Sequence, residues 1–409
     1  MFELRSYQTT LAAKAADILR RLGLVMLFLQ VRCGKTHIAL EVARMIGANN
    51  VLFLTKKKAI KSIESDYAIA DHKFRIIVTN YEQLKNIDTA PIDLFILDES
   101  HTVGCSYPKP SLRAKQLRTA IGRRPVIYLS GTPHPESPSQ LFHQLWVTRN
   151  SPYDVYRNFY EWVRAGYVKV YQTKRGAWMI NEYDRADYDR IKKDLDGMIL
   201  TYSQEQAGFT GKVEEHFLEV NDQSVSVLMK RMFKDRILEF PEGAAVADTP
   251  ASVIGKLHQL AGGSIICENG TAIVSEAKAA FIKEHFAGKR VVIFHKYTGE
   301  RKILDKYFPD ATDSPEDFQE RKSSTFIGQI ISAREGTNLS SADCIVMYAI
   351  DFAALSYLQG IARIQNLYRN TTANIYWVFF AGSIERRVYA AVSKKLDFTY
   401  RYFVKSGAI

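Results

Sequence analysis

GLVMLFLQVRCGKTHIAL, residues 23–40, joins a short apolar run to an amphipathic segment through a loop. Residues 24–29 are apolar throughout and predict a buried strand, whereas apolar side chains recur at helical spacing after the loop. Gly34, Lys35 and Thr36 therefore stand where a loop enters a helix, and the N–H groups and dipole of a helix start favour a bound anion. We expect a nucleoside triphosphate, with Lys35 paired to its β- and γ-phosphates and the Thr36 hydroxyl bound to Mg²⁺.

This match to the phosphate-loop pattern G-x-x-x-x-G-K-[ST] is incomplete, because Leu29 stands where the first glycine is usual. A chance Gly-Lys-Thr sequence that begins a helix is the alternative interpretation of the same residues. The rest of the chain has to decide between the two.

Composition and charge narrow the class of protein. The chain has 409 residues, enough for two or three domains, and its 46% hydrophobic and 24% charged residues are typical of globular proteins with sizeable cores. Its formal charge of +11 favours a polyanionic partner, nucleic acid before an anionic membrane surface. Four scattered cysteines and no C-x-x-C indicate neither zinc nor a disulfide framework, which fits a reducing cytosol. No apolar stretch approaches the roughly 18 residues that span a bilayer, and no signal-peptide core is seen, so we expect no membrane partner.

Short apolar runs alternate with helical patterns after the loop, which predicts βαβ crossovers and a parallel sheet covered on both faces. The predicted strands of this first half are residues 51–55, 75–79, 94–97 and 126–129. Ligands of such sheets bind at the carboxyl ends of the strands. Asp98 closes one strand and is placed to hold Mg²⁺, and Glu99 is placed to orient or deprotonate the water that attacks the γ-phosphate. Solvated acids that merely end a strand are the alternative interpretation.

These segments resemble a known family. GKT (34–36), DESH (98–101) and SGTP (130–133), preceded by LRSYQ (4–8), are similar to motifs of superfamily-2 helicases, most of all the Swi/Snf-like branch and its short phage-encoded members. Further segments resemble later motifs of that branch in the same order: VVIFHKYTGERKIL (291–304), EGTNLSSADCIVMY (335–348), QGIARIQN (359–366) and SIERRVYAAVSKK (383–395).

The resemblance implies an α/β fold with two RecA-like parallel-sheet domains in tandem and a helical insertion between them. It implies ATP and Mg²⁺ as cofactors, a monomer, and a bacterial or phage-infected cytosol. The expected divisions are 1–147 for the first RecA-like ATPase domain, 148–217 for a helical, basic and aromatic insertion, 218–271 for a helical linker region, and 272–409 for the second RecA-like domain.

The resemblance also assigns roles to single residues. The implied catalytic residues are Lys35, Glu99, Arg363 and Arg369. The implied ATP contacts are Arg5, Gln8, Arg32, Cys33, Gly34, Lys35, Thr36 and Gly336, and the implied Mg²⁺ ligands are Thr36 and Asp98. Gln8 would read the adenine and Arg363 would act as the arginine finger. Asn366 occupies the usual place of a second arginine, so either Arg369 substitutes for it or the ATPase is slow.

Residues 149–175 hold six Lys or Arg against two acids, a local charge of +4, and many aromatic residues surround them. We expect the cations to contact nucleic acid and the rings to form the core of the insertion. The predicted nucleic-acid contacts on loops are Thr55, Lys56, Asn80, His295, Lys296, Thr337 and Asn338. These residue types bind phosphate rather than base edges, so binding should be salt-sensitive and blind to sequence.

The partner implied by the resemblance is duplex or branched DNA, although the same residue types also serve RNA. The first hypothesis is a DNA-dependent ATPase that translocates along DNA or remodels it. The second is a catalytically weak, ATP-responsive nucleic-acid-binding regulator, for which Asn366 is the support. The third is a motor subunit of a larger restriction or defence assembly, although the sequence shows no recognisable nuclease module.

Overall fold

The computed structural model describes residues 3–30, 33–69, 72–131, 133–134, 137–175, 178–203, 205–208, 213–330, 339, 341–352 and 372–394. The chain divides into two compact units, Met1–Gly208 and Phe209–Ile409. Each unit is built on its own parallel sheet.

The sheet of the first unit has the strand order β3-β2-β4-β5-β1-β8, and every neighbouring pair is parallel. Its strands are β1 (Leu24–Leu29), β2 (Asn50–Thr55), β3 (Arg75–Asn80), β4 (Leu94–Asp98), β5 (Val126–Leu129) and β8 (Ile199–Tyr202). The five strands predicted in the first half are confirmed to within one residue at each end. Because β1 lies between β5 and β8 and carries only apolar side chains, it is a buried interior strand.

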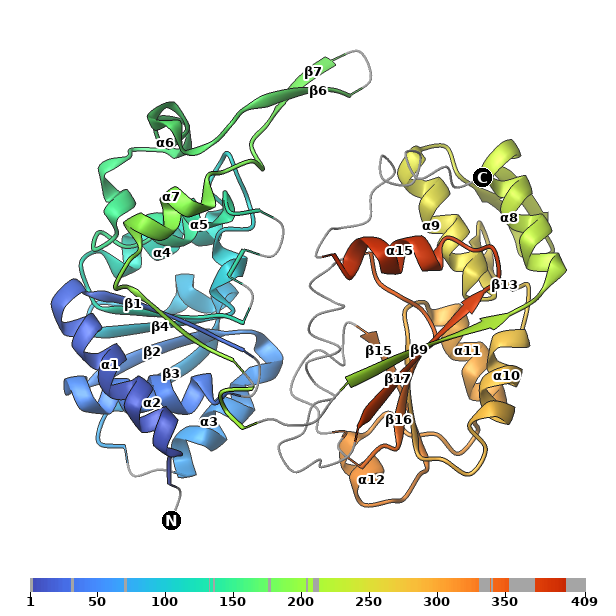
Figure 1. Cartoon of the computed structure of the whole chain (residues 1–409), viewed down its shortest axis with the longest axis horizontal. Helices are drawn as coiled ribbons and strands as arrows, with labels where there is room; N and C mark the ends of the chain where they lie inside the picture. Colours follow the sequence, from blue (N-terminus) through green and yellow to red (C-terminus); the bar gives the residue numbers. More distant parts are fainter. Residues whose placement is uncertain are drawn as a thin grey trace. The chain divides into compact units, whose positions relative to one another are not determined.

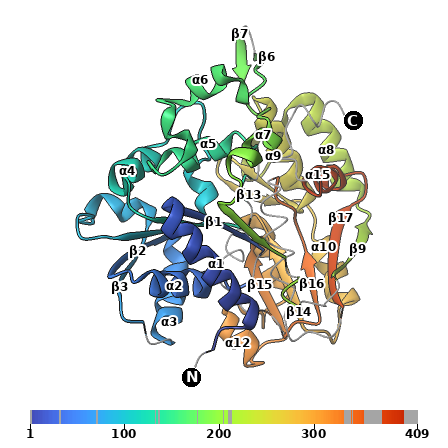
Figure 2. The same ribbon diagram turned by 60° about the vertical axis from the view of Figure 1, so that its left-hand side comes forward.

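Helices and short helical turns connect these strands. They are α1 (Ser6–Leu22), α2 (Lys35–Ile46), η1 (Lys57–Ala59), α3 (Ile60–Ile69), η2 (Tyr81–Asn86), η3 (Ser100–Val103), α4 (Leu112–Ile121) and α5 (Gln140–Trp146). Helices α1 and α2 lie side by side in both views (Figures 1 and 2). Alanines at positions 12, 15 and 16 of α1 are buried there and allow this close packing.

The rest of the first unit mixes short helices with strands. It contains η4 (Pro152–Val155), α6 (Phe159–Trp162), η5 (Val163–Tyr167), β6 (Tyr171–Arg175), β7 (Trp178–Glu182) and α7 (Tyr188–Asp194). The segment expected to be a helical insertion, residues 148–217, is therefore only partly helical. Its strand β8 belongs to the first sheet, and β9 (Val213–Val220) belongs to the sheet of the second unit.

Four aromatic rings of this segment are core, as predicted. Tyr153, Phe159, Trp162 and Tyr167 are buried, and the rings of Trp162 and Tyr167 stack with centroids 4.9 Å apart. They join the same hydrophobic core as the strands of the first sheet. The prediction is wrong for Trp178, which is 77% exposed because the hairpin that carries it has no packed face.

The second unit has a five-stranded parallel sheet of order β15-β14-β16-β17-β9. Its other strands are β14 (Val291–His295), β15 (Thr325–Gln329), β16 (Cys344–Met347) and β17 (Ala373–Phe380). The helices are α8 (Gln223–Asp235), α9 (Pro250–Ala261), α10 (Ala277–His285), α11 (Thr298–Tyr307), α12 (Pro315–Gln319) and α15 (Glu385–Val392). The segment QGIARIQN, residues 359–366, lies outside the described residues.

The expected helical linker, residues 218–271, is helical only in α8 and α9. Between and after them lie the hairpins β10 (Ile237–Phe240) with β11 (Gly243–Val246) and β12 (Ser264–Cys267) with β13 (Gly270–Ile273). Side chains of α8, α9 and both hairpins enter the hydrophobic core of the second unit. Figures 1 and 2 show α8 beside α9 in both orientations.

Two parallel sheets in a mixed α/β chain are consistent with the predicted RecA-like class. The tandem arrangement of two such domains and the helical insertion stay predictions. Among the helices of the described part of the chain, none is long and apolar enough to cross a membrane.

Candidate functional site

Lys35 begins α2 at the carboxyl end of β1. Its Nζ donates to the carbonyl oxygens of Leu29 at 3.1 Å and Gln30 at 3.4 Å, so the ammonium group lies back over the loop. The next side chain, Thr36, is half-buried in the first turn of the helix. Phosphate oxygens would compete well with two neutral carbonyls for this ammonium group, because charge-assisted hydrogen bonds are the stronger ones.

The loop is packed against the start of α1 through Gly34. Gly34 has φ +78°, and a β-carbon there would lie 2.0 Å from Nε2 of Gln8, so only glycine fits. Gln8 is 5% exposed, and its Oε1 accepts a hydrogen bond from the Arg5 backbone N–H at 2.9 Å. The predicted ATP contacts Arg5, Gln8 and Gly34 are thus brought together.

Two tyrosines, Tyr7 and Tyr202, lie beside the same loop and were not predicted from the sequence. The Tyr7 hydroxyl donates to the carbonyl oxygen of Cys33 at 3.3 Å, and the Tyr7 ring stacks on Tyr202 with centroids 4.8 Å apart. Tyr7 stands beside Gln8 in the LRSYQ segment, so its position was a usable signal. Tyr202 lies in no motif, and only the pairing of β8 with β1 places it here.

Asp98 closes β4 at the same edge of the sheet. The Thr55 hydroxyl donates to its Oδ2 at 2.7 Å, and the Tyr81 hydroxyl donates to its backbone oxygen at 2.6 Å. Burial and, next, the charge of Glu99 raise the pKa of Asp98 to about 6, against the opposing effects of the Thr55 hydrogen bond and the nearby Lys35 ammonium. A divalent cation would favour the ionised carboxylate, so this buried acid fits the predicted Mg²⁺.

No group of three or more His, Cys, Asp or Glu side chains that could hold a metal is found among the described residues. A Mg²⁺ ion at Asp98 and Thr36 would therefore depend on phosphate oxygens and water for its other ligands. Mg²⁺ commonly binds in this way, through one or two protein groups and a nucleotide.

Glu99 and His101 connect this edge to the strand β5. Nδ1 of His101 lies 3.3 Å from Oε2 of Glu99 and 3.2 Å from the Ser130 hydroxyl oxygen. Burial lowers the pKa of His101 to about 4, and the positive charge of Lys56 contributes, so the imidazole is neutral near pH 7. It therefore hydrogen-bonds to these groups rather than pairing as a cation, and it joins the DESH and SGTP segments.

Loop residues predicted to contact nucleic acid differ in how they are placed. Thr55 is fully buried and engaged with Asp98, and His295 is 3% exposed with its Nδ1 3.1 Å from the Tyr297 carbonyl oxygen. Both side chains are closed to solvent and support the fold internally, and their contact with nucleic acid stays a prediction. Asn80 is half-buried and caps η2 by accepting the Gln83 backbone N–H, and Lys56 is half-buried directly after β2.

Lys296 follows β14 in the second unit and is held in place. Its Nζ lies 3.0 Å from Oδ1 of Asp351 and 4.0 Å from the centroid of the Phe352 ring. A phosphate contact by Lys296 would compete with this ion pair. The remaining predicted site residues, which are Arg32, Gly336, Thr337, Asn338, Arg363 and Arg369, lie outside the described residues and stay predictions.

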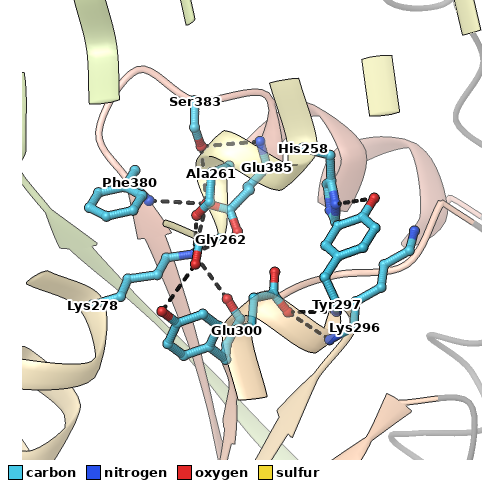
Figure 3. A network of polar contacts seen from close by, with 11 residues as sticks. His258, Ala261, Gly262, Lys278, Lys296, Tyr297, Glu300, Phe380, Ser383 and Glu385 are labelled. Atoms are coloured by element: carbon cyan, nitrogen blue, oxygen red, sulfur yellow. Dashed lines mark hydrogen bonds and ion pairs between the residues drawn. The ribbon is translucent and has the colours of Figure 1, made fainter. Parts of the chain in front are cut away.

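A buried polar network supports the loop that carries Lys296 (Figure 3). Glu300 is buried in the first turn of α11, and its Oε2 accepts the backbone N–H groups of Lys296 at 2.7 Å and Tyr297 at 3.0 Å. Its Oε1 has no hydrogen-bond partner among the described residues and faces Gly262, where a β-carbon would lie 2.0 Å away. Burial raises the pKa of Glu300 to about 7.

This raised pKa predicts a pH dependence of stability for the second unit. Between pH 4.5 and 7 the folded protein keeps a proton on Glu300 that the unfolded chain loses, so the contribution of Glu300 to stability is fully present below pH 4.5 and is lost as pH rises to about 7. As pH rises through that interval, the free energy of unfolding of Glu300→Gln should increase by on the order of 3 kcal/mol relative to that of the wild type. Denaturant unfolding of both proteins at pH 4.5, 5.5 and 7 measures this, and a constant difference between them would contradict it.

A lysine at the start of a helix and an adjacent Asp-Glu pair, at one edge of a parallel sheet, are features of P-loop nucleotide-binding proteins. Residues 35–235 match the family model described as SNF2-related domain, which supports a Swi/Snf-like member of the superfamily-2 helicases. The match covers just under half of the 409 residues and leaves the likeness to phage-encoded members a prediction. A search of curated proteins gave no match.

Proposed function

We propose that this chain is a nucleic-acid-dependent ATPase that translocates along or remodels duplex or branched DNA in the cytosol. The observation that carries the proposal is the placement of Lys35 near the buried Asp98, with Glu99 as the next residue, at the carboxyl edge of one sheet. The family match supports it independently, because SNF2-family proteins act on nucleic acids and are usually ATP-hydrolysing translocases.

The chemistry follows from these side chains. Lys35 would bind the β- and γ-phosphates, and Thr36 with Asp98 would hold Mg²⁺, which offsets phosphate charge when bound. Glu99 would orient the attacking water and accept its proton. The neutral His101 would steady the Glu99 carboxylate through their 3.3 Å contact. Gln8, packed on Gly34, would face the nucleotide base.

ATP hydrolysis measured without nucleic acid and with single-stranded DNA, duplex, fork, four-way junction and RNA tests the proposal. Stimulation by duplex or branched DNA is the expected result. Negligible turnover with every nucleic acid would contradict it and favour the ATP-responsive regulator.

Glu99→Gln is the sharper test of the site. The amide cannot accept a proton, so turnover should fall by at least about 10²-fold, whereas ATP binding should stay near wild type because the phosphate contacts remain. Fluorescent-nucleotide titration and phosphate release measure the two quantities. Glu64→Gln, an exposed glutamate of α3, is the matched control and should be active. Wild-type turnover in Glu99→Gln would show that Glu99 does not act as the general base.

A further inference from the structure

The hairpin β6–β7 is a two-stranded ribbon, and none of the other described strands pairs with it. It projects away from the sheet and helices of the first unit in both views (Figures 1 and 2). An isolated two-stranded hairpin is only marginally stable in water. A ribbon that leaves its own core in this way is suited to be covered by a partner.

The ribbon exposes apolar side chains on both faces. Trp178 is 77% exposed, Met179 57% and Ile180 39%. Successive side chains of a strand point to opposite faces, so Trp178 and Met179 cannot both pack against the first unit in any register. At least one of the two side chains must therefore face solvent, and the more exposed of them is the Trp178 ring.

The charges around the ring favour a polyanion. Lys169 is exposed just before the ribbon, and Lys174 lies on the strand opposite Met179. Residues 169–185 hold four Lys or Arg against Glu182 and Asp184, so this segment keeps a formal charge of +2. What the ribbon offers a partner is thus a flat ring accompanied by positive charge.

The base of the ribbon is anchored next to the candidate site. The hydroxyl of Ser137 donates to the Asp184 carbonyl oxygen at 2.6 Å, and that of Ser139 donates to the Tyr183 carbonyl oxygen. Both serines belong to the segment that leads from the SGTP residues into α5. In α5, Gln144 donates to the Pro133 carbonyl oxygen at 2.5 Å and accepts from the Ser100 hydroxyl at 3.4 Å. A contiguous set of hydrogen bonds therefore joins the ribbon to DESH.

We propose that the β6–β7 ribbon is a nucleic-acid contact in which Trp178 stacks on an unpaired base. This rests on the proposed function. An unpaired base offers a free π-face to an exposed ring, whereas bases within a blunt duplex are already stacked on both sides. Phosphates next to that base would lie within reach of the ribbon's lysines.

Intrinsic fluorescence of the full-length protein reports on Trp178. Of the four tryptophans, Trp162 and Trp377 are buried and Trp146 is half-buried, so the difference in acrylamide quenching between wild type and Trp178→Phe isolates the exposed ring. Single-stranded and forked DNA should shield this difference signal from acrylamide, and a blunt duplex should leave it unchanged. Equal quenching with and without forked DNA would overturn the proposal.

Binding of forked DNA gives the second measurement. Trp178→Ala should weaken it about tenfold, with ATPase activity in the absence of nucleic acid unchanged, and Trp178→Phe should retain most of the affinity because its ring still stacks. Val155→Ala, which trims an exposed apolar side chain outside the ribbon, is the control. Wild-type affinity in Trp178→Ala overturns the stacking contact alone, whereas no binding of any DNA by the wild-type protein overturns the proposed function as well.

Discussion

Lys35→Ala is expected to abolish ATP hydrolysis, with turnover at least about 10²- to 10³-fold below wild type. The ammonium group is the cation at the start of α2, and it rests on neutral carbonyl oxygens that phosphate oxygens would replace. Removing a preorganised donor of this kind costs factors of that size, because charge developing on the transferring phosphoryl group loses its partner. Phosphate release at saturating DNA measures the effect.

Lys61→Ala is the control for this experiment, since Lys61 is an exposed lysine on α3 of the same unit. It should hydrolyse ATP at the wild-type rate. A Lys35→Ala protein that turns over ATP normally would show that the Gly-Lys-Thr sequence is only a helix start. That outcome would restore the alternative interpretation of the loop.

Lys278→Met should strongly destabilise the second unit. The side chain of Lys278 is fully buried, and its Nζ donates to Glu385 Oε1 at 2.8 Å and to the carbonyl oxygens of Ala261 and Tyr348, each at 2.9 Å (Figure 3). These bonds tie α10 to α9, β16 and α15. Removing one partner leaves the Glu385 carboxylate buried without its counter-ion, which costs about 3–5 kcal/mol.

Hydrogen exchange of β14 and β16 measures this loss, because amides in the core strands exchange only through large openings. Protection should fall by roughly 10²- to 5 × 10³-fold, in line with that free energy. Lys306→Met is the matched control, since it breaks a surface pair in which Lys306 lies 2.7 Å from Glu276. Its exchange should stay close to wild type. Unchanged protection in Lys278→Met would mean that Glu385 takes up a proton at no cost.

Local patterns were enough to predict five of the six strands of the first sheet. These strands are short runs of buried apolar residues, and burial on both faces makes such runs continuous rather than alternating, so β1, β4 and β5 could be assigned directly. The same holds for Lys35 and Asp98, because each directly adjoins a strand end and the carboxyl ends of parallel strands meet at one edge. The positions of these residues could be predicted because they depend only on residues adjacent in sequence.

Side-chain burial could not be predicted in the same way. Thr55 and His295 have the polar character of contact residues, yet the fold turns Thr55 toward Asp98 and buries His295 at the end of β14. In the opposite sense, Trp178 has the character of a core residue and lies in solvent. The polarity of a residue indicates which environments its side chain can occupy. Packing between elements distant in sequence decides whether that side chain is buried or exposed.

By itself, the sequence determined the α/β class, the position of the Gly-Lys-Thr loop between a strand and a helix, and the acidic pair at the end of β4, because these depend on periodicity and on residues adjacent along the chain. The tertiary structure alone decided the stacking of Tyr202 on Tyr7, the division of the middle segment between two sheets, and the buried bond of Lys278 to Glu385. Each of these joins residues far apart in sequence, and only the pairing of strands and the packing of helices bring them within contact distance.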